Sequence, residues 1–159
     1  MSVVIRHAVR ADRDLIYSFI CELAEYEKLL DEVDATVADI ERDLFGQAPR
    51  VFCDIAEWNG EAVGFAVWFA NFSTFSGRHG IYLEDLFVRP AFRGRGLGKA
   101  LLVNLAKRAV AEKCSRVEWS VLDWNEPSIA FYKSLGAKPM DAWTIFRLSD
   151  EALRCLAAT

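Results

Sequence analysis

The segment from Arg93 to Lys99 carries the residues best suited to chemistry with a phosphate group. It is basic and rich in glycine, and its residues are Arg93, Gly94, Arg95, Gly96, Leu97, Gly98 and Lys99. It follows an apolar run and precedes a stretch with helical apolar spacing, so we expect a turn between a strand and a helix. A helix N-terminus attracts anions through its N–H groups and dipole, and glycine lets a phosphate approach the backbone. The segment therefore predicts a site for a phosphate-containing ligand.

Two common phosphate-binding patterns do not fit this segment. A Walker A loop needs glycine where Arg93 stands and Ser or Thr where Ala100 stands. A dinucleotide-binding fingerprint needs its third glycine one residue after Gly98. An ordinary flexible turn with a solvated basic face is the remaining alternative.

A pair of acidic residues interrupts the apolar run that precedes the turn. Residues 81–88 should form a strand, in which strict alternation places Glu84 on one face and Asp85 on the other. Asp85 would then share its face with Ile81, Leu83 and Phe87. Buried carboxylates are costly unless they are paired or used, so we expect one of the two to be structural and the other functional. For Glu84, simple pairing with a nearby arginine is the alternative.

The elements that would position these residues are a mixture of strands and helices. Strands are expected at residues 3–7, 51–58, 62–70, 81–88, 117–122 and 143–148. Helices are expected after Asp12, after Thr36, from the glycine-rich turn to about Lys113, at residues 128–135 and near the C-terminus. Asn59-Gly60 predicts a tight hairpin turn, and residues 71–80, with their Ser, Thr and Gly, predict a loop. We expect one mixed α/β domain spanning residues 1–159.

Composition excludes several classes of function. The formal net charge of −4 argues against a nucleic-acid partner. No apolar run approaches the roughly 18–20 residues of a membrane span, and the N-terminus lacks a signal-peptide core, so we expect no membrane association and a cytoplasmic location. The cysteines Cys21, Cys53, Cys114 and Cys155 are widely spaced, and only two histidines are present. We therefore expect neither a bound metal nor disulfides.

The glycine-rich turn has the pattern Arg/Gln-x-x-Gly-x-Gly, carried by Arg93, Gly96 and Gly98. It resembles the pyrophosphate-binding loop of the GNAT acetyltransferase superfamily. The flanking stretches YLEDLFVRPAFRG and VLDWNEPSIAFYKSLGA, with ELAEYE earlier in the chain, resemble the spermidine/spermine N-acetyltransferase family. The resemblance covers essentially the whole chain. It implies a central, mostly antiparallel twisted sheet with splayed strands, flanked by helices.

The resemblance also implies a set of roles. Acetyl-CoA would lie along the strand end Leu86, Phe87 and Val88, with its pyrophosphate on Arg93 to Lys99 and its arm near Asn125 and Ser128. Tyr132 would be the general acid for the leaving thiolate, although by pattern alone it could be a core aromatic residue. Glu84 would accept the amine proton through water. Tyr26 and Glu27 would bind the amine, with ordinary solvation at a helix end as the alternative. Transfer would be direct within a ternary complex, and the protein would be a homodimer.

The expected acceptor is a small cationic amine. The segment Ser73-Thr74-Phe75 lacks the acidic residue and tryptophan of the polyamine branch, and together with VLDWN it is more similar to relatives that acetylate thialysine-like compounds and short diamines. Two other functions stay open. One is acetylation of a protein N-terminus or lysine, and the other is a non-catalytic acetyl-CoA-binding module.

Overall fold

The computed structural model describes residues 2–159, which form two compact units, residues 2–120 and residues 121–159. The first unit holds a five-stranded sheet in the order β1-β2-β3-β4-β5. Its strands are β1 (Val3–His7), β2 (Phe52–Trp58), β3 (Glu61–Ser73), β4 (Arg78–Val88) and β5 (Val117–Trp119). Neighbouring strands are antiparallel from β1 to β4, and β5 is parallel to β4. The expected open, mostly antiparallel sheet is confirmed.

Two hairpins build the centre of this sheet. Asn59 and Gly60 turn the chain between β2 and β3 with φ angles of 52° and 86°, which confirms the predicted tight turn. The loop predicted at residues 71–80 is wrong over most of its length. The ladder between β3 and β4 continues to Ser73 and Arg78, and only residues 74–77 connect the strands. Main-chain pairing extends the hairpin through this polar sequence. The ring of Phe72 also makes an edge contact with the ring of His79, with 5.2 Å between their centroids.

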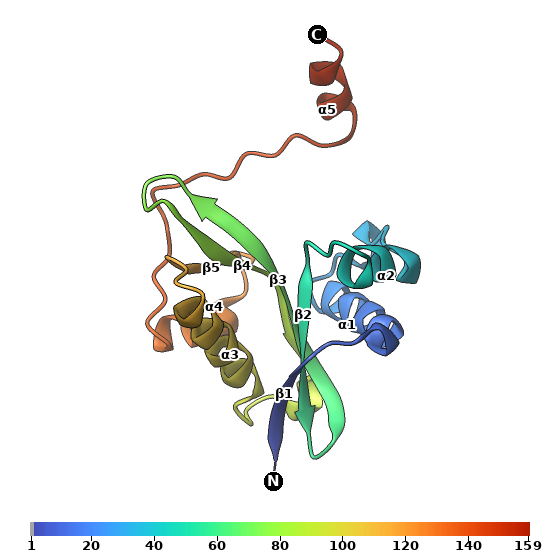
Figure 1. Cartoon of the computed structure of the whole chain (residues 1–159), viewed down its shortest axis with the longest axis vertical. Coiled ribbons are helices and arrows are strands. Elements are labelled where there is room, and N and C mark those ends of the chain that lie inside the picture. Colours follow the sequence, from blue (N-terminus) through green and yellow to red (C-terminus); the bar gives the residue numbers. More distant parts are fainter. Residues whose placement is uncertain (1) are drawn as a thin grey trace. The chain divides into compact units, whose positions relative to one another are not determined.

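Helices cover both faces of the sheet (Figure 1). On one face lie α1 (Arg13–Tyr26) and α2 (Val37–Phe45), and on the other lies α3 (Leu97–Ala111). The helix expected after Asp12 is confirmed as α1, and its residues Ile16, Phe19 and Leu23 are buried in the core. The start of α2 is also confirmed, since Thr36 and Asp39 form a reciprocal capping box. Short 3-10 turns occur at Arg10–Asp12, Leu30–Glu32 and Pro90–Phe92.

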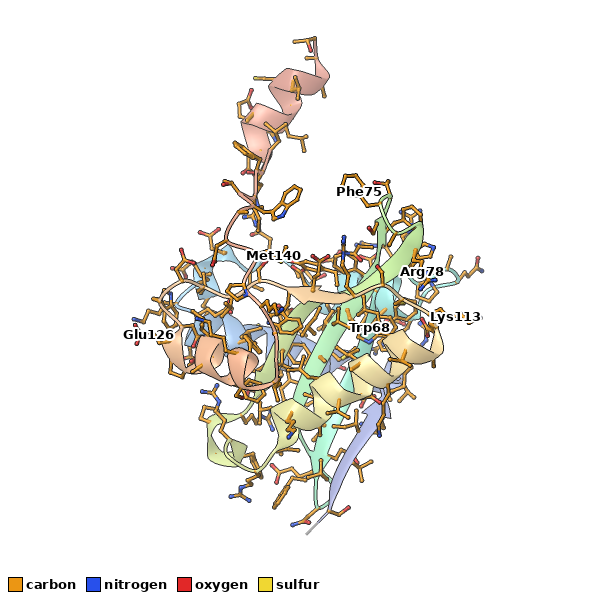
Figure 2. The ribbon with its side chains drawn as sticks, turned by 90° about the vertical axis from the view of Figure 1, so that its left-hand side faces the viewer. Trp68, Phe75, Arg78, Lys113, Glu126 and Met140 are labelled. Atoms are coloured by element: carbon orange, nitrogen blue, oxygen red, sulfur yellow. The ribbon has the colours of Figure 1, made fainter. Side chains whose placement is uncertain are left out.

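A buried carboxylate ties α3 to the sheet. Asp54 of β2 has 1% of its surface exposed. It accepts hydrogen bonds from Trp68 Nε1 of β3 and Asn104 Nδ2 of α3, each at 3.1 Å, and lies 3.0 Å from His7 Nδ1 of β1. Arg108 of α3 also stacks over the Trp68 ring, 4.8 Å from its centroid. Trp68 thus marks the face of the sheet that α3 covers (Figure 2).

The second unit contains α4 (Glu126–Ser134) and α5 (Asp150–Ala157). The helix expected at residues 128–135 is confirmed as α4, and Gly136, with a φ angle of 89°, follows its end. Two strand predictions are wrong. The strand expected at 117–122 ends at Trp119, and residues 143–148 form no strand in the described chain. A strand needs a neighbouring strand with which its main-chain groups can form hydrogen bonds. The side chains of this segment are instead exposed, among them Trp143, Ile145, Phe146 and Leu148.

Candidate active site

A β-bulge shapes β4 where the two carboxylates lie. Asp85 stands opposite Val67, but the next residue of β3, Trp68, stands opposite Leu83. Glu84 is therefore an extra residue in the ladder. Because residues directly opposite each other share a face, Leu83 faces α3 with Trp68, whereas Asp85 faces α1 with Val67.

This bulge corrects the predicted alternation. Ile81 and Leu83 were expected to share a face with Asp85 and Phe87, but the bulge moves the two pairs to opposite faces of the sheet. Phe87 packs on the α1 side, with its ring centroid 6.3 Å from that of Phe19. Asp85, next to it on the same side, is half-buried at the end of the α1 core.

Two carboxylates, Glu84 and Glu27, act on a third, Asp85, in this region. Glu84 is exposed, whereas burial, with added repulsion from Glu84 and Glu27, raises the pKa of Asp85 to about 7. Glu27, the residue after α1, is half-buried, and burial raises its pKa as well. The structure thus brings the predicted Glu27 and Glu84 near one shared neighbour. A concentration of negative charge of this kind attracts a cationic ligand.

Asp85 is the candidate functional residue that sequence reasoning did not select. The acidic pair was visible in the sequence, and one of its members was expected to have a function. Strict alternation gave no reason to prefer Asp85, because the bulge that sets its surroundings leaves no local sequence signal.

The glycine-rich turn has the geometry that a phosphate site requires. Gly94 and Gly96 have φ angles of 75° and 82°, which favour glycine, and a Cβ at either would meet nothing within 4 Å. Gly96 is the N-cap of α3 and provides no side-chain cap, so the first-turn N–H groups can receive a ligand. Leu97 is buried in the core and could offer only its main-chain N–H, whereas Lys99 is exposed.

The two arginines of the turn lie over aromatic rings. The Arg93 guanidinium carbon lies 4.5 Å from the centroid of the Tyr26 ring, and its Nε donates to the Val88 carbonyl at 2.9 Å. The Arg95 guanidinium lies 5.1 Å from Trp58 and 5.3 Å from Phe92. The structure therefore brings Arg93 and Tyr26, predicted for different ligands, into direct contact.

The end of β4 offers an open main-chain edge in the described part of the chain. Its pairing with β5 covers only residues 81–83, so β5 does not continue beside Leu86, Phe87 and Val88. The pairing of the two strands thus ends before the residues that were predicted to lie along acetyl-CoA. The Phe87 side chain is buried, so this residue could offer a ligand only its main chain. Such an edge can hydrogen-bond to an extended, amide-containing group.

A hollow of about 280 Å³ lies beside this strand end, lined by Glu22, Glu25, Tyr26, Phe87 and Pro90. Glu22 is engaged, because Arg89 binds it at 2.8 Å and holds the pKa of this carboxyl below its usual value. The hollow lies between Tyr26 of α1 and Phe87 of β4. Its size suits part of a small ligand.

The remaining predicted residues lie in the second unit. Asn125 is the N-cap of α4, and its Oδ1 accepts the Ser128 N–H at 3.4 Å. Tyr132 lies within α4, half-buried, with its ring centroid 5.5 Å from that of Phe131. Their proposed roles toward the first unit stay predictions.

Residues 2–159 contain no cluster of three or more His, Cys, Asp or Glu side chains suited to a metal ion. No helix among them has the length and apolar character needed to cross a membrane.

The sequence pattern of the acetyltransferase (GNAT) family matches residues 14–137. Among curated proteins, the thialysine N-epsilon-acetyltransferase of Bos taurus is 39% identical, with 98% of this chain and 97% of the bovine protein covered. The protein of the same name from Sus scrofa is 40% identical, with 98% of each chain covered. The human spermidine/spermine N(1)-acetyltransferase-like protein 1 is 36% identical over 96% of this chain but only 23% of its own length.

Solved structures agree with the observed fold. An integron cassette protein from the mobile metagenome of V. cholerae superposes with a TM-score of 0.83 at 29% identity, covering 100% of this chain and 99% of that one. A ribosomal-protein-alanine N-acetyltransferase from Brucella melitensis gives a TM-score of 0.73 at 18% identity, with 94% and 100% covered. At that identity the second likeness concerns the fold alone.

Proposed function

The chain belongs to the acetyltransferase (GNAT) family and is an acetyl-CoA-dependent N-acetyltransferase, and we propose that its acceptor is a small cationic amine of the thialysine or short-diamine type. The observation that carries the proposal is the group of three carboxylates, Glu27, Glu84 and Asp85, near the open end of β4. The activity named for the bovine and porcine relatives supports the same class of acceptor.

The first unit fits the binding of acetyl-CoA. The main chain of Leu86, Phe87 and Val88 would pair with the pantetheine amides along the edge of β4. The N–H groups after Gly96 would hold the pyrophosphate, with help from the charges of Arg93, Arg95 and Lys99. In the second unit, Asn125 and Ser128 would contact the CoA arm.

The carboxylates would remove the proton that blocks attack. A primary ammonium has a pKa of about 10, so it must lose a proton before its nitrogen can act as a nucleophile. Asp85, whose pKa is raised to about 7, is a stronger base than an ordinary carboxylate. Exposed Glu84 would pass the proton through water to Asp85 or to solvent. Tyr26 and Glu27 would hold the amine at the end of α1.

Tyr132 would complete the reaction. The amine nitrogen forms a bond to the acetyl carbonyl carbon while the carbon–sulfur bond breaks. Tyr132 would donate its phenolic proton to the departing sulfur and recover a proton from solvent. The amine nitrogen loses two protons in all, one before the attack and one after its bond to the carbonyl carbon has formed, and the sulfur takes up one. The products are therefore the acetylated amine, the CoA thiol and one proton released to solvent.

A panel of acceptors tests the proposal. CoA release is measured with thialysine, lysine, short diamines, spermidine, spermine and peptides, and we expect the highest kcat/KM for thialysine or a short diamine. Tyr132→Phe should lower kcat about 100-fold or more while changing acetyl-CoA affinity little, because only the proton donor is lost. Preference for peptides would overturn the acceptor class, and an unchanged kcat would overturn the role of Tyr132.

We further propose that the protein is a cytoplasmic homodimer. The support for the dimer is the exposed apolar segment at residues 143–148, whose pattern predicts a strand but which has no partner strand in the described chain. A second copy could supply such a partner.

A further inference from the structure

Arg93 is a physical link between the two proposed substrate sites. It belongs to the phosphate-binding turn, yet its guanidinium lies over the Tyr26 ring, 4.5 Å from the centroid, and 5.8 Å from the centroid of the Phe87 ring. Its Nε donates to the carbonyl of Val88, the last residue of β4. One side chain thus joins the turn, the open strand end and the end of α1.

The contact with Tyr26 acts on the place where the amine is proposed to bind. Tyr26 is the last residue of α1, and Glu27 follows it directly. Main-chain hydrogen bonds continue past Tyr26, because the N–H groups of Glu27 and Leu29 donate to carbonyls within α1. A cation held against the Tyr26 ring therefore restricts mainly the side chains at this helix end. Residues 93–96 are all exposed and include two glycines, so the side-chain contacts of Arg93 and Arg95 are the chief links between this turn and its surroundings.

We propose that Arg93 couples the two sites, so that occupancy of the phosphate-binding turn strengthens amine binding at Tyr26 and Glu27. A phosphate ligand fixes the turn, and the fixed turn holds Arg93 against Tyr26. The side chains at the end of α1 are then already ordered when the amine arrives. Linkage requires the reciprocal effect, in which the amine strengthens CoA binding by the same factor. This inference rests on the proposed function.

Calorimetric titration tests the coupling directly. The Kd of thialysine is measured with and without saturating CoA, which cannot transfer an acetyl group. We expect CoA to tighten thialysine binding about fivefold or more in the wild type. In Arg93→Lys the factor should fall below about twofold, because lysine keeps the charge but loses the planar stacking group. Tyr26→Leu should have the same effect, whereas Tyr26→Phe keeps the ring and should keep the coupling.

Arg95→Lys is the matched control. It is the same substitution in the same turn, but Arg95 lies over Trp58 and Phe92 rather than over Tyr26. It should leave the coupling factor within about twofold of the wild-type value, whatever its effect on CoA affinity. Thermal unfolding of each variant verifies that it is folded.

The outcomes separate this inference from the proposed function. A coupling factor near 1 in the wild type, or one that Arg93→Lys leaves unchanged, overturns the inference even if acetyl transfer is efficient. Absence of acetyl transfer to every amine of the panel overturns the proposed function, while the coupling of the two binding equilibria is still measured.

Discussion

Asp85 shows how much the surroundings of one residue change its chemistry. Its carboxyl group is half-buried on the α1 side of β4, near Glu84 and Glu27. These surroundings raise its pKa to about 7, so the group is protonated at mildly acidic pH and ionised above neutrality. A carboxylate with this pKa is a suitable acceptor for the proton of an ammonium group near physiological pH.

We expect Asp85→Asn to lower kcat/KM about 100-fold at pH 8. In the wild type, kcat/KM should rise with pH through about 7 as Asp85 ionises. In the variant, the only rise in kcat/KM that should remain is the one caused by deprotonation of the substrate's ammonium group, whose pKa is about 10. Initial rates between pH 5.5 and 9.5 measure both profiles, with Glu84→Gln as the neighbouring comparison. Superimposable profiles for the wild type and Asp85→Asn would exclude Asp85 as the base.

Stability gives a second measurement on the same variant. The pKa of Asp85 is higher in the folded chain than the value near 4 of an unfolded aspartate, so the folded state binds more protons between these values. The contribution of Asp85 to stability therefore falls as pH rises from about 4 through about 7. Asp85→Asn should exceed the wild type in free energy of unfolding by about 1–3 kcal/mol at pH 8, with a smaller difference at pH 5.

At the scale of elements, helices and tight turns were predictable because their signals are local. Each of these signals depends only on residues a few positions apart in the sequence. They are the buried stripe Ile16, Phe19 and Leu23, the capping pair Thr36 and Asp39, and the turn Asn59-Gly60. The strand expected at residues 143–148 failed for the opposite reason. Its apolar pattern is strand-like, but a strand also requires an edge that no local signal supplies.

The candidate site was predictable in part. The turn from Arg93 to Lys99 and the acidic pair were identified from residue types and spacing, and the structure gives the turn the expected geometry. The bulge at Glu84 and the contact between Arg93 and Tyr26 depend on register and on residues far apart in the sequence. Such features follow from the folded chain and cannot be obtained from periodicity.

The attachment of α3 to the sheet should depend strongly on Asp54. Asp54→Ala leaves the Trp68 and Asn104 donors without their acceptor in a buried place. We expect the free energy of unfolding to fall by about 2–4 kcal/mol. Asp39→Ala, the same substitution at the exposed cap of α2, should lower it by about 1 kcal/mol. Denaturant titration compares the two, and an equal or smaller loss for Asp54→Ala would contradict this account.

At the scale of the whole molecule, the exposed apolar segment at residues 143–148 is the feature to test. Light scattering at several concentrations should give the mass of a dimer for the wild type. Phe146→Glu should shift the mass toward that of a monomer, because Phe146 is 92% exposed and a charge there would be desolvated at an interface. Val9→Glu changes another exposed apolar residue, in the first unit, and should leave the dimer intact. A monomeric wild type would contradict the dimer.

The bulge in β4 also constrains how this protein can be changed by insertion and deletion. Removing the single extra residue at Glu84 would still leave Leu83 opposite Trp68 and Asp85 opposite Val67, now in a ladder with regular alternation. Leu83 would therefore keep the face that α3 covers and Asp85 the face that α1 covers, and only the local bend and twist of the strand would change. When segments are exchanged among relatives, a one-residue gap in this strand should accordingly be placed at Glu84, because a gap there preserves the facing of every other side chain.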